Sequence, residues 1–170
     1  IKKQTEKRKY LKIIDNCSLK DGEKSISIEP TEDQSLQVNF KLDYDNKVIG
    51  KQENQVNFSN KDLTDIYSSR TFCLLKDIEK IKKSGLAKGG SLDNAIVVDE
   101  DKIVNKNGLR NKKEFVNHKI LDLAGDFMLS GYRILGKVKC NQGGHHFSNS
   151  FLRKLLKTKN VLIFSVQTKV

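Results

Sequence analysis

The sequence predicts an α+β fold: a two-layer sandwich of a mostly antiparallel sheet and two main helices, with a small βαβ-like insert. Three observations indicate this class. Residues 1–60 alternate apolar and polar side chains as strands do, later segments repeat apolar residues at helical spacing, and no internal repeat or low-complexity linker divides the chain. A chain of 170 residues suits one domain with its own core. We therefore expect residues 1–170 to form a single domain.

The first part of the chain is predicted to be strands. Alternation with period two favours strands over 8–14, 23–29 and 35–44, and a short one over 55–59. The stretches NCSLKDG and PTEDQ are interpreted as the breaks between them. We expect these strands to form an antiparallel meander with one face on the core.

The middle of the chain is expected to mix short helices and strands. Ser59 and Asp62 have the spacing of a capping-box-like helix start. Residues 70–85 place apolar side chains near helical spacing and stop at a glycine, which predicts a helix. A glycine-rich loop over 85–94 and two very short strands over 95–105 follow.

The longest predicted helix covers 111–129, with Asn111 at the cap and Glu114 three residues on. After it we expect a strand over 134–140, a basic amphipathic helix over 145–157 and a strand-like tail over 160–170.

Charge and cysteine usage narrow the classes of partner and compartment. The net charge of +11 comes mostly from lysine, and either a compositional bias or an anionic partner accounts for it. The lysines are scattered and interleave poorly with aromatics, so no nucleic-acid partner is expected. Three widely separated cysteines without a CxxC pair indicate free thiols in a reducing compartment.

The helix predicted over 111–129 carries a ladder of titratable residues: His118, Asp122 and Asp126. At about 100° per residue these lie opposite an apolar face made of Val116, Ile120, Leu123, Ala124 and Phe127. Two interpretations remain open. The ladder is either a solvated polar face, or His118 and Asp122 are two ligands of one Zn²⁺, since i, i+4 spacing lets two side chains converge on a metal.

The other two histidines, His145 and His146, follow two glycines and open the second predicted helix. They belong either to a polar loop–helix junction or to a functional site in which Asp126 compensates the charge of one of them. The sequence shows no HExxH, Walker, GxSxG or GxGxxG pattern, and no third metal ligand is obvious.

Several short patterns occur together in one order. They are R-T-F, G-G-S-x-D-x-A-I-V-V, N-x-x-G-L-R, E-F-V-x-H-K-x-L-D-x-x-G-D and G-H. In this order and spacing the chain resembles the C-terminal domain of the zinc-dependent UDP-3-O-acyl-N-acetylglucosamine deacetylases, which carry out the committed step of lipid A synthesis in Gram-negative bacteria. The resemblance is strong over about 70–153 and collinear but weaker over 5–60.

The resemblance implies roles for five residues. His118 and Asp122 match the zinc ligands of the family. Asp126 matches the carboxylate that pairs with the catalytic histidine, which falls on His145 and not on His146. Thr71 matches a hydroxyl that reaches the developing oxyanion.

The resemblance also implies a substrate site. Lys119 would lie near the diphosphate of the substrate, and the insert, about 70–105, would form a hydrophobic passage for its acyl chain. The expected substrate-binding residues of this passage are Phe72, Leu74, Leu75, Ile78, Ala87, Gly90, Ser91, Leu92 and Asn94.

The chain departs from the family pattern in several places. The third zinc ligand of the family, a His, and the general-base Glu before it belong to an N-terminal domain and have no match here. We therefore expect this chain to be the C-terminal half of the enzyme and inactive alone. Gln142 stands where the family often has a Lys, and Asn94 is polar within an apolar lining.

The interpretation is a zinc-dependent deacetylase that converts UDP-3-O-acyl-N-acetylglucosamine to UDP-3-O-acyl-glucosamine and acetate. Its expected partners are that substrate, the N-terminal domain and, by peripheral contact, the inner face of the inner membrane; its expected location is cytoplasmic. The alternative is a non-catalytic, degenerate or split module that binds lipid-linked nucleotide sugar. A nucleic-acid-binding domain is disfavoured because no aromatic platform is found on a strand.

Overall fold

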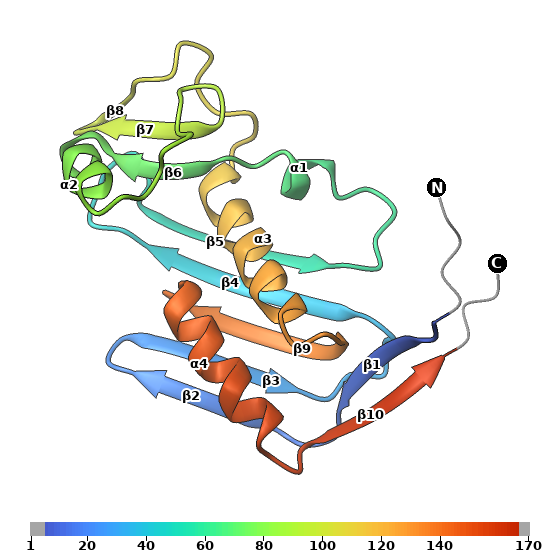
Figure 1. The fold of residues 1–170 in the computed structure, drawn as a ribbon. Coiled ribbons are helices and arrows are strands. Elements are labelled where there is room, and N and C mark those ends of the chain that lie inside the picture. Colours follow the sequence, from blue (N-terminus) through green and yellow to red (C-terminus); the bar gives the residue numbers. More distant parts are fainter. Residues whose placement is uncertain (1–5, 167–170) are drawn as a thin grey trace.

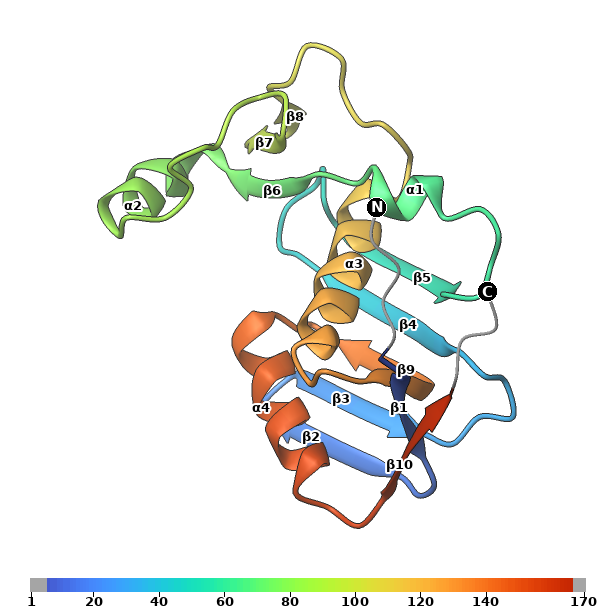
Figure 2. The same ribbon diagram turned by 45° about the vertical axis from the view of Figure 1, so that its right-hand side comes forward.

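The computed structural model describes residues 6–166 and has the predicted α+β class (Figure 1). A mixed sheet carries two long helices on one face, and a smaller sheet forms an insert beside them. Figure 2 shows the insert projecting from the body of the sandwich. None of the helices within residues 6–166 is long and apolar enough to cross a membrane.

The main sheet has seven strands, in which β10, β1, β9, β3 and β2 are neighbours in that order and β4 and β5 extend from β9. The strands are β1 (Arg8–Ile13), β2 (Cys17–Asp21), β3 (Lys24–Glu29), β4 (Leu36–Asp43), β5 (Lys51–Asn57), β9 (Arg133–Asn141) and β10 (Val161–Val166). Residues 167–170 of the predicted tail lie outside the described residues.

The predicted meander is wrong, because β9 inserts between strands that are close in sequence. It pairs in parallel with β1 over its first three residues and in parallel with β4 from Gly136 on, while β3 lies antiparallel to it. A Cβ at Gly136 would lie 2.7 Å from Ile13 Cγ1, so only glycine fits where β9 passes from β1 to β4. Alternation identifies a strand but carries no information about its partner.

Two strand boundaries also differ from the prediction. The stretch NCSLKDG, expected to be a break, contains β2, which forms a tight hairpin with β3. The predicted short strand over 55–59 is β5, which begins at Lys51 and pairs with β4 along its whole length. Polar residues occupy most of β5 because only one side of it packs on the core. The first half of the strand therefore lacks the alternating apolar residues from which a strand is predicted.

The helix predicted over 70–85 is wrong in its first half. Residues 71–74 form β6 (Thr71–Leu74), followed by a 3-10 turn, η1 (Leu75–Asp77), and a short α2 (Ile78–Lys83). β6 pairs in parallel with β7 (Ala95–Asp99), and β8 (Lys102–Ile103) completes the small sheet. Pairing with the β-branched run of β7 overrides the helical spacing, and the unit is the predicted βαβ-like insert.

The two long helices are α3 (Glu114–Met128) and α4 (His145–Leu156), and a short α1 (Thr64–Tyr67) precedes the insert. Neither predicted capping box forms. Leu63 occupies the N-cap of α1, and Asp62 accepts a hydrogen bond from the Thr64 N–H instead. Lys113 occupies the N-cap of α3, and the carboxylate of Glu114 turns into the protein, away from the cap.

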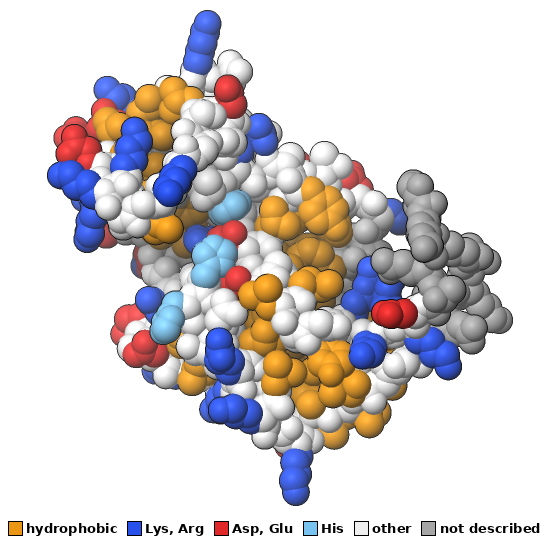
Figure 3. All heavy atoms as spheres, viewed as in Figure 1, with side chains coloured by type: hydrophobic (Ala, Val, Ile, Leu, Met, Phe, Trp, Pro, Cys, Tyr) orange, Lys and Arg blue, Asp and Glu red, His pale blue; other side chains and the backbone are white. Residues whose placement is uncertain are grey.

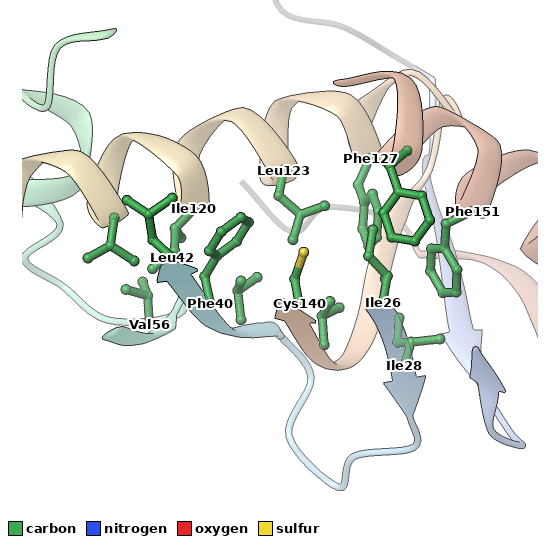
Figure 4. Packing of buried hydrophobic residues seen from close by; sticks show 14 of the residues in the cluster. Ile26, Ile28, Phe40, Leu42, Val56, Ile120, Leu123, Phe127, Cys140 and Phe151 are labelled. Atoms are coloured by element: carbon green, nitrogen blue, oxygen red, sulfur yellow. The ribbon is translucent and has the colours of Figure 1, made fainter. Parts of the chain in front are cut away.

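The core lies between the two long helices and the main sheet (Figure 4). The predicted apolar face of α3 is buried there: Val116, Ile120, Leu123 and Phe127 are at most 1% exposed. Phe127 stacks on Phe151 of α4, with ring centroids 6.0 Å apart. Burial of this face against the sheet fixes the direction in which the opposite face of α3 points.

Candidate metal and acid–base site

The titratable ladder of α3 is not a solvated surface. The side chains of His118, Asp122 and Asp126 are only 15%, 17% and 10% exposed. The segment before β6 contacts His118, and the first residue of α4 contacts Asp126. Figure 3 shows the histidines in one row on the helix-bearing face, with acidic side-chain atoms between them. Charged groups held together at this level of burial require partners.

The ring of His118 is fixed by both nitrogens. Its Nδ1 lies 3.2 Å from the carbonyl oxygen of Ser69, which can only accept, so this contact is a hydrogen bond in the tautomer that carries the proton on Nδ1. Its Nε2 lies 3.2 Å from Oδ1 of Asp122. Burial lowers the pKa of His118, although the neighbouring Asp122 acts in the opposite direction. In the neutral form with the proton on Nδ1, two lone-pair atoms, Nε2 and Oδ1, face each other.

Two facing lone-pair donors are suited to a shared cation. Imidazole nitrogen and carboxylate oxygen are ligands of Zn²⁺, and two such ligands at about 2.1 Å from a tetrahedral ion are about 3.4 Å apart. The 3.2 Å separation between His118 Nε2 and Asp122 Oδ1 is close to this value. Within residues 6–166 no group of three or more potential ligands surrounds a single position. The residues present thus fit part of a zinc site.

The second oxygen of Asp122 is held by Lys119. The ammonium of Lys119 lies 3.1 Å from Asp122 Oδ2 and 5.7 Å from the ring centroid of Phe72, in a cation–π arrangement. Lys119 therefore points into the ladder and also borders a hollow lined by Gln142 and two glycines. Phe72 joins this residue to the core through an edge-to-face contact with Phe115.

His145 forms a histidine–carboxylate pair with Asp126. Its Nδ1 is 3.0 and 3.1 Å from the two carboxylate oxygens, and its Nε2 is 3.8 Å from Asp122 Oδ2. The His145 side chain is 65% exposed, whereas Asp126 is nearly buried. Asp126 therefore fixes the ring and leaves Nε2 beside the facing His118–Asp122 donors, where it can give or take a proton. His146 is exposed.

The turn that leads into α4 is held from two sides. The amide of Gln142 pairs with the backbone of Asp43, donating to its carbonyl and accepting from its N–H at 3.2 Å. Gly143 packs so closely that a Cβ there would lie 2.4 Å from Cys140 Sγ. These contacts set the point from which His145 projects, and they engage both the oxygen and the nitrogen of the Gln142 amide.

The insert contains a hollow of about 590 Å³ with mostly apolar walls. Most of the residues predicted for the passage line it: Phe72, Ile78, Ala87, Gly90, Ser91, Leu92 and Asn94. Thr71 also lines this hollow. Leu74 and Leu75 are not part of it, because they border a separate hollow with Asp45 and Asn46.

Polar residues within the insert close its loop. Asn94 donates to Gly89 O at 2.9 Å and accepts from the Ser91 N–H at 2.9 Å. Asn105 is 5% exposed and bonds to the backbone of Leu92 and Val97. Asn94 is therefore a loop-closing residue, and its amide is occupied within the wall of the hollow.

Sequence reasoning missed the buried ion pair between Arg70 and Glu114. Glu114 is fully buried and Arg70 is 8% exposed. Burial acts to raise the pKa of Glu114, but hydrogen bonds from the side chain and N–H of Arg70 and from the N–H of Arg110 outweigh it and lower the pKa. The available signal was the presence of Arg70 and Glu114 in two of the quoted patterns, R-T-F and E-F-V.

The fold and the site together define a class: an α+β domain in which His118, Asp122 and Asp126 of one helix meet His145 of another. Comparison with known families agrees. Residues 1–157 match the family described as LpxC, UDP-3-O-acyl N-acetylglycosamine deacetylase. The chain belongs to this family.

Individual relatives carry the same description. The chain is 40% identical over 161 residues to a UDP-3-O-acyl-N-acetylglucosamine deacetylase of Campylobacter jejuni subsp. doylei, covering 94% of this chain and 54% of the relative. The corresponding proteins of a Nitratiruptor species and of Haemophilus ducreyi are 40% and 37% identical, over 92% and 96% of this chain and 52% and 54% of theirs. The chain thus spans about half the length of the curated relatives it matches.

Proposed function

We propose that this chain supplies half of the active site of an enzyme that hydrolyses the acetamide of UDP-3-O-acyl-N-acetylglucosamine, giving UDP-3-O-acyl-glucosamine and acetate. One observation carries the proposal: His118, Asp122 and Asp126 of α3, each at most 17% exposed, meet the more exposed His145 at the start of α4. Membership of the deacetylase family supports the choice of reaction and substrate.

Zn²⁺ would be held by Nε2 of His118 and Oδ1 of Asp122, the two facing donors. When bound, it supplies a Lewis acid for the amide carbonyl and makes a bound water more acidic. Two donors are fewer than the three protein ligands that catalytic zinc usually has. The third ligand and the general base belong, in this proposal, to an N-terminal domain, and the chain alone binds zinc weakly and is inactive.

His145 acts as the general acid. Asp126 accepts the Nδ1–H and holds the ring, so that the proton on Nε2 of the protonated ring faces the reaction centre. Nε2 first donates a hydrogen bond to the oxyanion that forms when water attacks the carbonyl. It then transfers this proton to the amine as the C–N bond breaks.

The remaining residues bind and orient the substrate. The hydroxyl of Thr71 is a further donor to the oxyanion, since Thr71 lies two residues after the Ser69 carbonyl that holds His118. The ammonium of Lys119 attracts the diphosphate. The hollow of the insert takes the acyl chain, with Phe72, Ile78 and Leu92 in its wall. Contact with an anionic inner-membrane face, from the cytoplasmic side, is consistent with the net charge of +11.

The test is a deacetylase assay with UDP-3-O-acyl-N-acetylglucosamine and zinc. The chain is assayed alone and mixed with the N-terminal half of a relative. We expect activity only in the mixture, lowered about 10²–10⁴-fold by His145→Ala and unchanged by His146→Ala, a neighbouring exposed histidine that serves as the control. A folded mixture that binds the substrate without hydrolysing it would refute the catalytic proposal and support a binding module.

A further inference from the structure

Glu114 makes more polar contacts than an ordinary ion pair requires. It is fully buried at the start of α3 and directs its carboxylate at the segment that precedes β6. Its donors are Arg70 Nε at 2.8 Å, Arg70 Nη2 at 3.2 Å, and the backbone N–H groups of Arg70 at 3.0 Å and Arg110 at 2.6 Å. A salt bridge alone needs only the guanidinium, so the two backbone contacts indicate a further role.

One of these backbone contacts leads directly to the proposed metal ligand. The N–H of Arg70 and the carbonyl of Ser69 belong to the same peptide group. The N–H donates to Glu114 Oε1, and the carbonyl accepts from Nδ1 of His118 at 3.2 Å. The peptide plane is rigid, so fixing its N–H also fixes the direction of its carbonyl. A continuous path of hydrogen bonds therefore runs from the Glu114 carboxylate, through one peptide group, to His118.

We propose that Glu114 is a positioning residue that aims the Ser69 carbonyl at His118 and so holds the imidazole with Nε2 turned toward Asp122. Many metal-binding histidines donate their second N–H to a carboxylate or a carbonyl, which fixes the tautomer and raises ligand basicity. Here a carboxylate and a carbonyl act in series, with the peptide group between them. The metal-ligand part of this inference rests on the proposed function; the orientation of His118 does not.

Arg70 completes the arrangement. Its guanidinium keeps the buried carboxylate paired and also donates to the carbonyl of Gly108 at 2.8 Å. Because Oε1 accepts both the Arg70 N–H and Nε, the guanidinium and the peptide of the same residue are held together. Hydrogen bonds in such a chain polarise one another, which strengthens the final bond to His118.

The test uses the 170-residue chain with ¹⁵N-labelled histidine, without metal, at a pH where the imidazoles are neutral. NMR shifts of the ring nitrogens report which one carries the proton. We expect His118 of the unsubstituted chain to be protonated only on Nδ1, and Glu114→Gln to give a mixture of tautomers. In the reconstituted mixture, we expect Glu114→Gln to weaken zinc binding by about 10–100-fold, the range for outer-shell partners of metal ligands.

Two further variants separate positioning from general stability. Ile28→Ala removes core volume at a fully buried residue of β3 and is expected to leave the tautomer unchanged. If Glu114→Gln does not fold, Glu114→Gln with Arg70→Met removes the pair without leaving an unpaired buried charge, and the mixed tautomers are expected there.

The inference is overturned if Glu114→Gln, or the double variant in its place, retains the single Nδ1–H tautomer. It is also overturned if Ile28→Ala disturbs the tautomer equally. Failure of the proposed function has a different signature, because the reconstituted unsubstituted protein would then bind no zinc while the tautomer measurement still decides the role of Glu114.

Discussion

The turn before α4 allows a prediction whose size follows from the structure. A Cβ at Gly143 would lie 2.4 Å from Cys140 Sγ and 3.5 Å from two ring atoms of Phe40, whereas a Cβ at Gly144 has nothing within 4 Å. The sulfur is at the end of a fully packed side chain that is 3% exposed, so it has little space into which to move. Gly143→Ala is therefore an overpacking substitution, with an expected cost of about 1–3 kcal/mol in the free energy of unfolding.

The assay is urea unfolding of the chain, read as a double-substitution cycle. With a slope of about 2 kcal/mol per molar urea, Gly143→Ala lowers the midpoint by about 0.5–1.5 M. Cys140→Ala removes the sulfur that the new methyl group would meet, so Gly143→Ala with Cys140→Ala is more stable than the sum of the two single changes predicts, by about 1–2 kcal/mol. Gly144→Ala is the control and costs less than about 1 kcal/mol.

The same variants test how the turn positions His145. We expect Gly143→Ala to lower deacetylation by the reconstituted halves and the added Cys140→Ala to restore part of it, because His145 begins α4 two residues after Gly143. Additive effects in the cycle, or equal costs for the alanines at Gly143 and Gly144, would refute the reasoning from close packing.

Three further predictions concern residues outside that turn. The folded-state pKa of Glu114 lies below its ordinary value of about 4.3, so its stabilising contribution is present above that pH and is lost as the pH falls through the folded pKa. The urea midpoints of the unsubstituted chain and of Glu114→Gln should therefore converge in acid. A constant difference down to the lowest pH would contradict this. Burial raises the pKa of Cys140 to about 12, so alkylation of the native chain should modify the half-buried Cys73 first and Cys140 only after unfolding; early labelling of Cys140 would argue against the packing described. Asn94→Ala should speed amide exchange and proteolysis over 85–94, because it removes the bonds to Gly89 and Ser91; unchanged exchange would show that the loop is closed by other contacts.

Local signals in the sequence were sufficient for α3 and for its two faces. The apolar residues of α3 repeat at helical spacing. Every residue of the predicted apolar face except Ala124 is buried in the structure. The same spacing placed His118, Asp122 and Asp126 together on the opposite face, and the structure brings them to His145. A helix fixes these relations within about four residues, so no tertiary information was needed.

Long-range pairing could not be predicted in the same way. The parallel partners of β9 and the strand character of 71–74 depend on residues far away in the sequence. Glu114 was expected to cap its own helix, but the 44-residue separation from Arg70 hid the partner that draws its carboxylate inward. The prediction failed because a buried charge is placed by its strongest available partner, and no local pattern identifies that partner.

The most direct test of the account is a zinc titration of the chain alone and of the chain reconstituted with an N-terminal half. The account predicts weak binding to the chain alone, tight binding after reconstitution, and loss of the tight site in both His118→Ala and Asp122→Ala, with the exposed His146→Ala unchanged. Zinc binding tighter than about micromolar that survives His118→Ala would show that the facing donors of α3 are not the metal site.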